Sequence, residues 1–190
     1  GSIRTTLGAT LAAEVRSHVI NARIRNYSSA LEAALEPKNI PLDVYHNLIS
    51  TVNQNLPRLH RYMRVRKQLM GLDELRFYDL YAPLVPQADM DVPYQEATQL
   101  VAAAFEPLGP DYAEALQKAF TNRWIDVYEN VGKRGGAYSG GSHKSAPFIL
   151  LNYQDRLRDV FTLAHELGHS MHSFFSWQTQ PFVYSNYTLF

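Results

Sequence analysis

The feature that most constrains this chain is an apolar stripe over residues 155–175. Its members recur three or four positions apart, which is the spacing of one face of an α-helix. They are Leu157, Phe161, Ala164, Gly168, Met171 and Phe175. A glycine in mid-helix costs about 1 kcal/mol relative to alanine, so we expect another backbone to pack closely against Gly168. The pattern therefore predicts a packed helix over residues 155–175.

Two histidines lie four positions apart on this predicted helix, and a glutamate follows the first. The spacing sets His165 and His169 about 40° apart around the helix and one turn apart along it, so both imidazoles can reach one metal ion. Neutral nitrogen ligands suit Zn²⁺, which in catalytic sites has three protein ligands and a water. Glu166 points roughly 100° away from His165, so its carboxylate can take a proton from that water without binding the metal. The motif predicts zinc-dependent hydrolysis with Glu166 as general base.

The residue that would complete the ligand set is less evident. A metzincin site needs a third histidine six residues after the second, and Phe175 occupies that position. His172 lies seven residues from His165, roughly 10 Å along the helix, and we interpret it as a supporting or structural residue. From Ser170 to Phe190 the sequence contains no Asp or Glu. The third ligand is therefore upstream or missing from this chain.

The first part of the chain has the pattern of helices. Residues 3–36 carry apolar side chains at helical spacing, and Pro37 ends that pattern. Pro41 opens a second helical stretch, in which Pro57 should produce a break or kink. Gly71 is typical of the residue that follows a helix.

Two further helices are predicted in the middle of the chain. The first begins at Pro93 and reaches Phe105. The second begins at Pro110, and Asp111 with Glu114 three residues later resembles a capping box. Each start is indicated by a proline, whose backbone angle suits the first turn of a helix.

Short strands are predicted at three places, over residues 75–81, 124–128 and 148–151. A cluster of glycines at 132–141 separates the last two. We therefore expect a mainly α protein with a small β element. Residues 1–122 form its helical part, residues 123–152 its β element with the glycine-rich loop, and residues 153–190 the motif helix and the start of the next segment.

The glycine cluster has two interpretations. It lacks the spacing of a phosphate-binding loop, and its glycines do not open a helix after a strand. Gly136, Ala137 and Tyr138 are candidates for binding an extended substrate through the backbone, in the manner of an added strand. A plain hairpin turn explains the same residues nearly as well. Trp177, Phe182 and Tyr184 follow the motif helix and are candidates for the wall of a pocket.

Composition and charge exclude several classes of function. The chain has no cysteine, which excludes disulfides, a cysteine-based zinc site and a cysteine nucleophile. Lys plus Arg and Asp plus Glu both number 18, so we expect neither nucleic acid nor an anionic membrane as partner. A basic cluster over residues 58–67 spreads around several helical faces, which indicates a solvated surface. No run of roughly 18 apolar residues and no signal peptide is present, so the expected location is cytoplasmic.

Several segments together resemble the M3 family of zinc metallopeptidases, and within it the oligoendopeptidase F group. The segments are Asp159–His172 around the motif, Gly136–Ser139, Phe148–Asn152, and Phe77–Leu84 upstream. The resemblance implies a largely helical fold with a deep channel that admits short, unfolded peptides. It also implies Zn²⁺ bound by His165 and His169, with Glu166 as general base.

In that family the third ligand is a glutamate about 25 residues past the second histidine. The corresponding position, ~194, lies beyond Phe190, as do the histidine and tyrosine that stabilise the oxyanion in family members. We therefore expect this chain to be a fragment of the catalytic domain of a larger peptidase, and to be inactive or nearly so by itself. The apolar, aromatic stretch at which it stops supports this interpretation. Exposed apolar surface and self-association of the fragment are also expected.

Other classes of function remain open at the level of sequence. A non-catalytic helical interaction module could retain a vestigial motif, although such a protein has no reason to keep Glu166 between two metal-competent histidines. A zinc hydrolase that acts on something other than peptides has the same motif. Polar histidines on a half-exposed helix are the simplest alternative, and the apolar stripe with the glutamate makes it the weakest.

Overall fold

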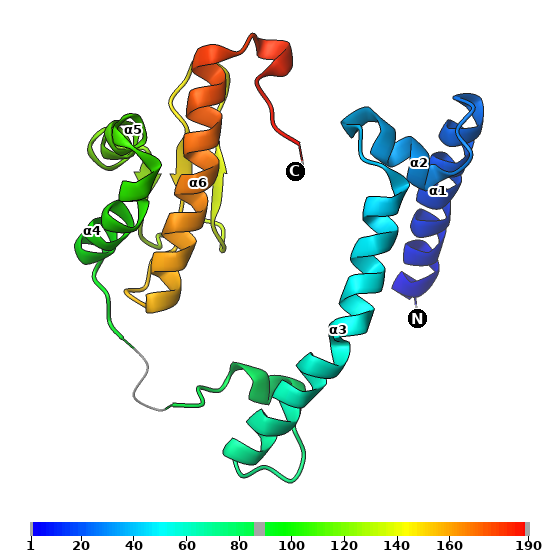
Figure 1. Cartoon of the computed structure of the whole chain (residues 1–190), viewed down its shortest axis with the longest axis horizontal. Coiled ribbons are helices and arrows are strands. Elements are labelled where there is room, and N and C mark those ends of the chain that lie inside the picture. Colours follow the sequence, from blue (N-terminus) through cyan, green and yellow to red (C-terminus); the bar gives the residue numbers. More distant parts are fainter. Residues whose placement is uncertain (1, 86–89, 189–190) are drawn as a thin grey trace. The chain divides into compact units, whose positions relative to one another are not determined.

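The computed structural model describes residues 2–85 and 90–188, and the chain forms two compact units. Unit 1 is Gly1–Leu84 and unit 2 is Val85–Phe190. Both are mainly helical, and unit 2 also holds a small sheet (Figure 1). The expected fold class, mainly α with a small β element, is confirmed. In the part of the chain that is described, no helix has both the length and the apolar content that a membrane span requires.

Unit 1 consists of helices joined by short turns. Its elements are α1 (Ser2–Ile24), α2 (Ala30–Leu35), the short 3₁₀ helix η1 (Glu36–Lys38), α3 (Leu42–Leu69) and a second 3₁₀ helix, η2 (Phe77–Tyr81). The single helix predicted over residues 3–36 is wrong, because Asn26 takes a left-handed conformation and Ser29 caps a new helix by accepting the Glu32 N–H at 3.0 Å. Pro57 lies inside a continuous α3, so no break occurs there. Gly71 has the positive φ expected after a helix.

The strand predicted over residues 75–81 is also wrong, since η2 occupies this segment. Its position depends on Arg66 of α3, which is buried and donates hydrogen bonds to the carbonyls of Asp79 and Ala82. Arg66 thereby departs from the solvated surface predicted for its cluster. A long-range cation that binds two carbonyls favours a turn over a strand here, because strand backbone would direct those carbonyls apart.

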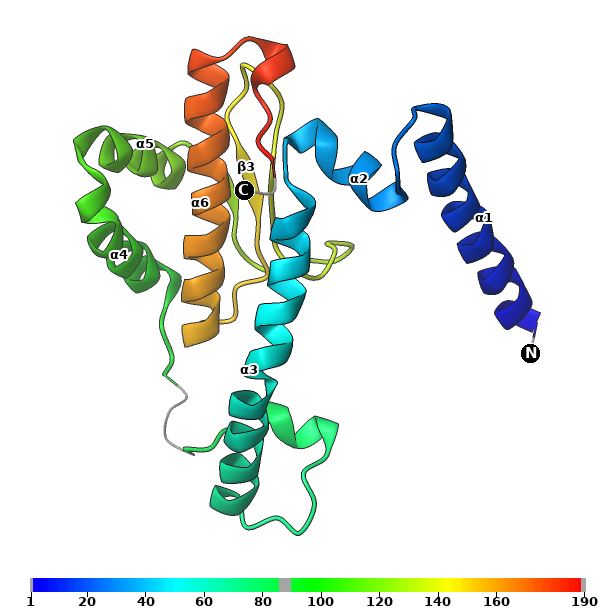
Figure 2. The same cartoon turned by 45° about the vertical axis from the view of Figure 1, so that its right-hand side comes forward.

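Unit 1 buries little apolar surface. Within its described residues only Ala22 and Arg66 are buried. The apolar stripe of α1 is exposed at every position, and its members are Ile3, Leu7, Leu11 and Val15. Figure 2 shows α1, α2 and α3 as separate rods joined by turns. The self-association expected from such surface stays a prediction.

Unit 2 holds the motif helix, and its elements follow the predicted order. They are α4 (Tyr94–Phe105), the 3₁₀ helix η3 (Glu106–Leu108), α5 (Pro110–Thr121), β1 (Ile125–Asp126), β2 (Tyr138–Gly140), β3 (Phe148–Leu150), α6 (Leu157–Thr179) and the 3₁₀ helix η4 (Phe182–Tyr184). The predicted capping box of α5 is wrong. Gly109 takes the cap position, and Glu114 instead pairs with Lys118 at 2.8 Å.

The sheet has the order β1-β3-β2, with β1 parallel and β2 antiparallel to β3. Ile149 of the central strand is buried, and it pairs with Ile125 on one side and Ser139 on the other. The strands predicted at 124–128 and 148–151 thus exist in shorter form. β2 lies in the glycine-rich segment 132–141, for which the sequence left two interpretations, a hairpin turn and an edge that binds substrate.

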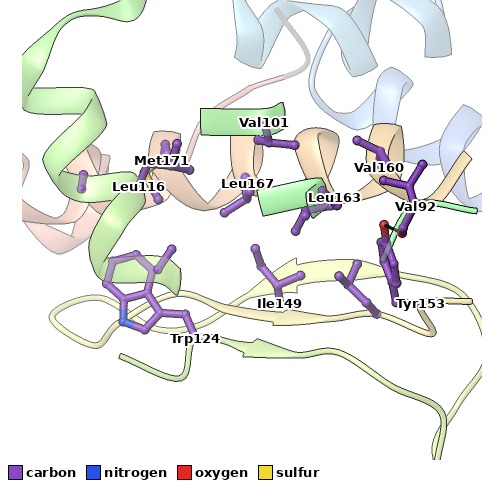
Figure 3. Packing of buried hydrophobic residues seen from close by; sticks show 14 residues of the cluster. Val92, Val101, Leu116, Trp124, Ile149, Tyr153, Val160, Leu163, Leu167 and Met171 are labelled. Atoms are coloured by element: carbon purple, nitrogen blue, oxygen red, sulfur yellow. Dashed lines mark hydrogen bonds between the residues drawn. The ribbon is translucent and has the colours of Figure 1, made fainter. Parts of the chain in front are cut away.

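Helix α6 packs its apolar face between the sheet and the helices α4 and α5. Figure 3 shows Leu163 and Leu167 between Val101 of α4 and Ile149 of β3. The fully buried side chains of this core include Ile149, Leu151, Leu163, Leu167 and Met171. At the start of α6, the carboxylate of Asp159 accepts hydrogen bonds from the backbone N–H groups of Gln154 and Arg156 at 2.9 and 3.1 Å. These hydrogen bonds fix the start of α6, and the buried side chains fix which face of the helix points toward the core.

The close backbone contact expected at Gly168 is wrong. A Cβ atom built at this position meets nothing within 4 Å. Gly168 is half-buried at the margin of the core face, whereas Leu163 and Leu167 are fully buried in the same cluster as Ile149 of the sheet. The structure offers no packing reason for this glycine.

Leu163→Ala should lower the free energy of unfolding by ~2–5 kcal/mol, because it leaves a cavity where the side chain is 0% exposed. Urea denaturation followed by circular dichroism measures this change. Phe161→Ala, on the same helix at 71% exposure, is the matched control and should change stability by less than about 0.5 kcal/mol. Equal losses of stability in the two variants would contradict the assignment of Leu163 to the buried face of α6 and Phe161 to the exposed face.

Tyr153 ties the end of the sheet to the segment before α4, since its hydroxyl donates to the Val92 carbonyl at 2.8 Å. Burial raises the pKa of Tyr153 to about 12, and Asp159 adds to this rise. The folded state therefore holds the phenol proton more tightly than the unfolded state does. This contribution to stability is complete below about pH 10 and should be lost as the pH rises toward 12.

Unfolding experiments at increasing alkaline pH measure that loss. Tyr153→Phe should reduce the pH dependence and cost about 1–3 kcal/mol at neutral pH, because it leaves the buried Val92 carbonyl without a partner. Tyr94, whose pKa burial also raises to about 12, accounts for the remaining dependence. An unchanged alkaline profile in Tyr153→Phe would exclude the role given to this hydroxyl.

Candidate metal and catalytic site

The two motif histidines meet on the face of α6 that points away from the core. Their Nε2 atoms lie 3.0 Å apart, and the ring centroids are 4.7 Å apart with the rings nearly perpendicular. Two nitrogen ligands at about 2.0–2.1 Å from a tetrahedral Zn²⁺ lie roughly 3.3 Å from each other. The pair is therefore arranged as two ligands of one such ion.

No further ligand joins this pair in the described chain. Across residues 2–85 and 90–188, no group of three or more His, Cys, Asp or Glu side chains is placed to hold a metal ion. His172 lies one turn beyond His169 on α6 and packs its ring against Tyr187, with centroids 4.2 Å apart. The donors present fit zinc in chemical type and direction, and they supply two of the three protein ligands of a catalytic site.

Glu166 lies at the border between the core face of α6 and the histidine face. Its side chain is buried, with the residue only 7% exposed. The carboxylate forms no hydrogen bond or ion pair with any residue that the structure describes. A carboxylate that has no protein partner, on a side chain that is otherwise largely buried, is suited to accept a proton from a small molecule beside it.

A pair of serines fixes the edge strand against the motif helix. Ser139 Oγ of β2 and Ser170 Oγ of α6 lie 2.7 Å apart, and Ser170 is fully buried. Ser170 directly follows His169, so this contact sets β2 against the turn of α6 that carries His169. β2 is the last strand of the sheet, and within the described residues one edge of its backbone has no strand partner.

The three substrate-binding candidates lie at the start of this edge. Gly136 has φ 91°, a conformation that disfavours other residues, and it precedes Ala137. Both line a cavity of about 550 Å³ with Thr162, which lies one turn before His165 on α6. Tyr138 is an exposed residue of β2 and does not line the cavity. The histidines themselves lie outside this cavity.

The candidate aromatic wall divides into two places. Trp177 and Phe182 line one hollow with His143, whose Nε2 lies 3.0 Å from the carbonyl of Gln180. Tyr184 lines a separate hollow with His172. Trp177 lies in the last turn of α6, and together with Phe182 and Tyr184 it does not form one continuous wall in the described chain.

Three residues of the site were not predicted from sequence. Ser139 and Ser170 form the strand-to-helix contact, and Tyr187 Oη lies 2.8 Å from His169 Nδ1. Ser170 could have been noticed as the neighbour of a candidate ligand. Tyr187 lies 18 residues from His169 in a non-helical segment, where no periodic spacing links the two.

The sequence profile described as "Peptidase family M3" matches residues 2–190. The chain belongs to peptidase family M3. It is 46% identical over 190 residues to the oligopeptidase PepF of Bacillus subtilis, and 48% identical over 185 residues to the group B oligopeptidase PepB of Streptococcus agalactiae. These alignments cover 100% and 97% of this chain.

Solved structures agree with this membership. The crystal structure of oligoendopeptidase-F from Enterococcus faecium matches 92% of this chain with a TM-score of 0.57 and 32% identity. A crystal structure of a protein from Chlamydophila abortus matches 99% with a TM-score of 0.76 and 41% identity. The M3 chain spans 28% and 31% of the length of the two oligopeptidases, and 25% and 31% of the two solved chains.

Gly141 next to β2 gives a test of the packing around this M3 site. A Cβ atom at this position would lie 2.7 Å from Trp177 Cη2 and 3.2 Å from the Ala146 carbonyl, and its φ of +152° is already unfavourable for other residues. Gly141→Ala should cost about 1–3 kcal/mol and change the tryptophan fluorescence. Gly135→Ala, which meets nothing within 4 Å, is the control. Equal stability of the two variants would show that the loop does not pack on α6 as described.

Proposed function

We propose that this chain supplies two zinc ligands and the general base of an endopeptidase that hydrolyses short peptides. The observation that carries the proposal is the convergence of His165 Nε2 and His169 Nε2 at 3.0 Å, with the buried carboxylate of Glu166 on the same helix. Membership of peptidase family M3 supports the reaction class. We further propose that the chain is a fragment of the catalytic domain, from a cytoplasmic enzyme.

His165 and His169 hold the ion through their Nε2 atoms, and their Nδ1 atoms then carry protons. The zinc supplies Lewis-acid polarisation of the peptide carbonyl and makes a water easier to deprotonate. Glu166 accepts the proton of the attacking water on its carboxylate and then delivers it to the nitrogen of the departing amine. The carboxylate has no described protein partner, so its lone pairs are available first to the water and then, with the proton, to the leaving amine.

The substrate binds as an extended chain along the free edge of β2. Gly136, Ala137 and Tyr138 contribute backbone groups to this edge, as in other cases where a peptide adds a strand to a sheet. The contact between Ser139 and Ser170 supports this arrangement, because it holds the edge against the turn of α6 that carries His169. Backbone pairing does not read side chains, so it suits an enzyme that accepts many short peptides.

The 190-residue chain should bind zinc weakly and cleave peptides slowly or not at all. Its described residues offer two ligands, and water would complete half of the coordination shell. The third ligand is expected to be a carboxylate located beyond Phe190. A helical interaction module with a vestigial motif is the second candidate, and it predicts no dependence of metal binding on the two histidines.

Zinc titration by calorimetry tests the proposal. His169→Ala should weaken binding about tenfold or more, because it removes one of two nitrogen ligands. Glu166→Gln is the matched control, and it should retain the wild-type affinity because Glu166 does not bind the ion. Identical binding by wild type and His169→Ala would overturn the assigned metal site and favour the interaction module.

Peptide cleavage by the same three proteins tests the remaining claim. Cleavage of a fluorogenic peptide should stay near background for the wild-type chain. Robust cleavage that a chelator abolishes and Glu166→Gln lacks would support the general base. That same result would refute the claim that the 190-residue chain is inactive.

A further inference from the structure

The segment that follows α6 runs back along the helix and places Tyr187 beside the histidine pair. Tyr187 Oη lies 2.8 Å from His169 Nδ1, and the two rings are nearly parallel at 12° with centroids 6.0 Å apart. The other contact of the tyrosine ring is with His172, at 4.2 Å between centroids. Tyr187 therefore touches the side of His169 opposite to the nitrogen that faces His165.

Independent contacts hold this segment in place. The chain turns after α6 and runs back in the opposite direction (Figure 1). Ser185 is buried, its hydroxyl donates to the Phe182 carbonyl at 2.8 Å, and its own carbonyl accepts from the hydroxyl of Ser176 on α6 at 2.8 Å. These bonds anchor the return two residues before Tyr187. The position of the tyrosine therefore does not depend on its bond to His169 alone.

We propose that Tyr187 is a positioning residue that keeps His169 in the tautomer able to bind metal, an inference that rests on the proposed function. A neutral imidazole has one N–H and one free lone pair, and only the nitrogen with the lone pair binds a metal ion. In the proposed tautomer the phenol oxygen of Tyr187 accepts the Nδ1–H of His169. The lone pair is then left on Nε2, where it faces His165 Nε2.

The two histidines differ in this respect. Among the described residues, His165 Nδ1 has no hydrogen-bond partner, whereas His169 Nδ1 has Tyr187. Metal-binding histidines usually donate their second N–H to a carboxylate, a backbone carbonyl or water. A phenol in that place fixes the ring without adding negative charge. Tyr187 therefore acts directly on His169, and it reaches His165 only through the contact between the two Nε2 atoms at 3.0 Å.

Nuclear magnetic resonance of the histidine-ring nitrogens in the metal-free chain tests the inference without any enzyme activity. Wild-type His169 should be mainly the Nδ1–H tautomer when neutral. In Tyr187→Phe its spectrum should move toward a mixture of tautomers, and the His165 spectrum should change with it, because the two Nε2 atoms lie 3.0 Å apart. Tyr184→Phe is the control, since this tyrosine is 72% exposed and its hydroxyl bonds to no described residue. The same His169 tautomer in wild type and Tyr187→Phe would overturn the proposal.

Zinc titration of the same variants adds a second measurement. Tyr187→Phe should weaken zinc binding about tenfold, and Tyr184→Phe should not change it. Loss of binding in His169→Ala with none in Tyr187→Phe would refute the role of Tyr187 and leave the metal site intact. If His169→Ala binds as wild type does, the proposed function fails, and the tautomer measurement alone decides whether Tyr187 orients His169.

Discussion

The packing of α6 against the central strand is the interaction on which the rest of unit 2 depends. Leu163, Leu167 and Met171 are buried against β3 and the helices α4 and α5. At about 100° per residue, burial of these positions turns residues 165, 169 and 172 to the opposite side of the helix. Glu166 falls between the two faces, about 60° from His169. The hydrophobic core thus sets the directions of all three residues of the motif.

The orientation of α6 also explains why Glu166 is buried while His165, in the same short motif, is exposed. His165 is exposed, whereas Glu166 is buried and has no described partner. Ser170 next to His169 points inward and contacts the edge strand through Ser139. A single rigid element therefore carries the proposed metal ligands, the proposed base and the link to the strand on which we propose that substrate binds. A rigid scaffold of this kind holds catalytic groups in place better than a loop does.

Sequence patterns predicted those elements whose structure depends on residues close together in the chain. The helix over residues 155–175 and the start of α4 at Pro93 were predictable, because periodicity and proline geometry act over a few residues. The predicted stripe of α6 was wrong in part, since Leu157 and Phe161 are exposed and the core-facing apolar residues are Val160, Leu163, Leu167 and Met171. The break near Asn26 was missed, because apolar spacing continued through it. The strand expected at 75–81 was wrong because a distant residue, Arg66, determines the shape of that turn. In the site, the motif on α6 was visible in sequence, whereas the contact between Tyr187 and His169 depends on a folded return of the chain.

The central claim is that His165 and His169 together bind one zinc ion. X-ray absorption spectroscopy at the zinc edge of the loaded chain tests it most directly, since imidazole rings give a distinct scattering pattern. The account predicts two imidazole nitrogens at about 2.0–2.1 Å, with oxygen ligands completing the shell, and one imidazole in His165→Ala or His169→Ala. A spectrum without imidazole scattering, or one that neither substitution changes, would contradict the account.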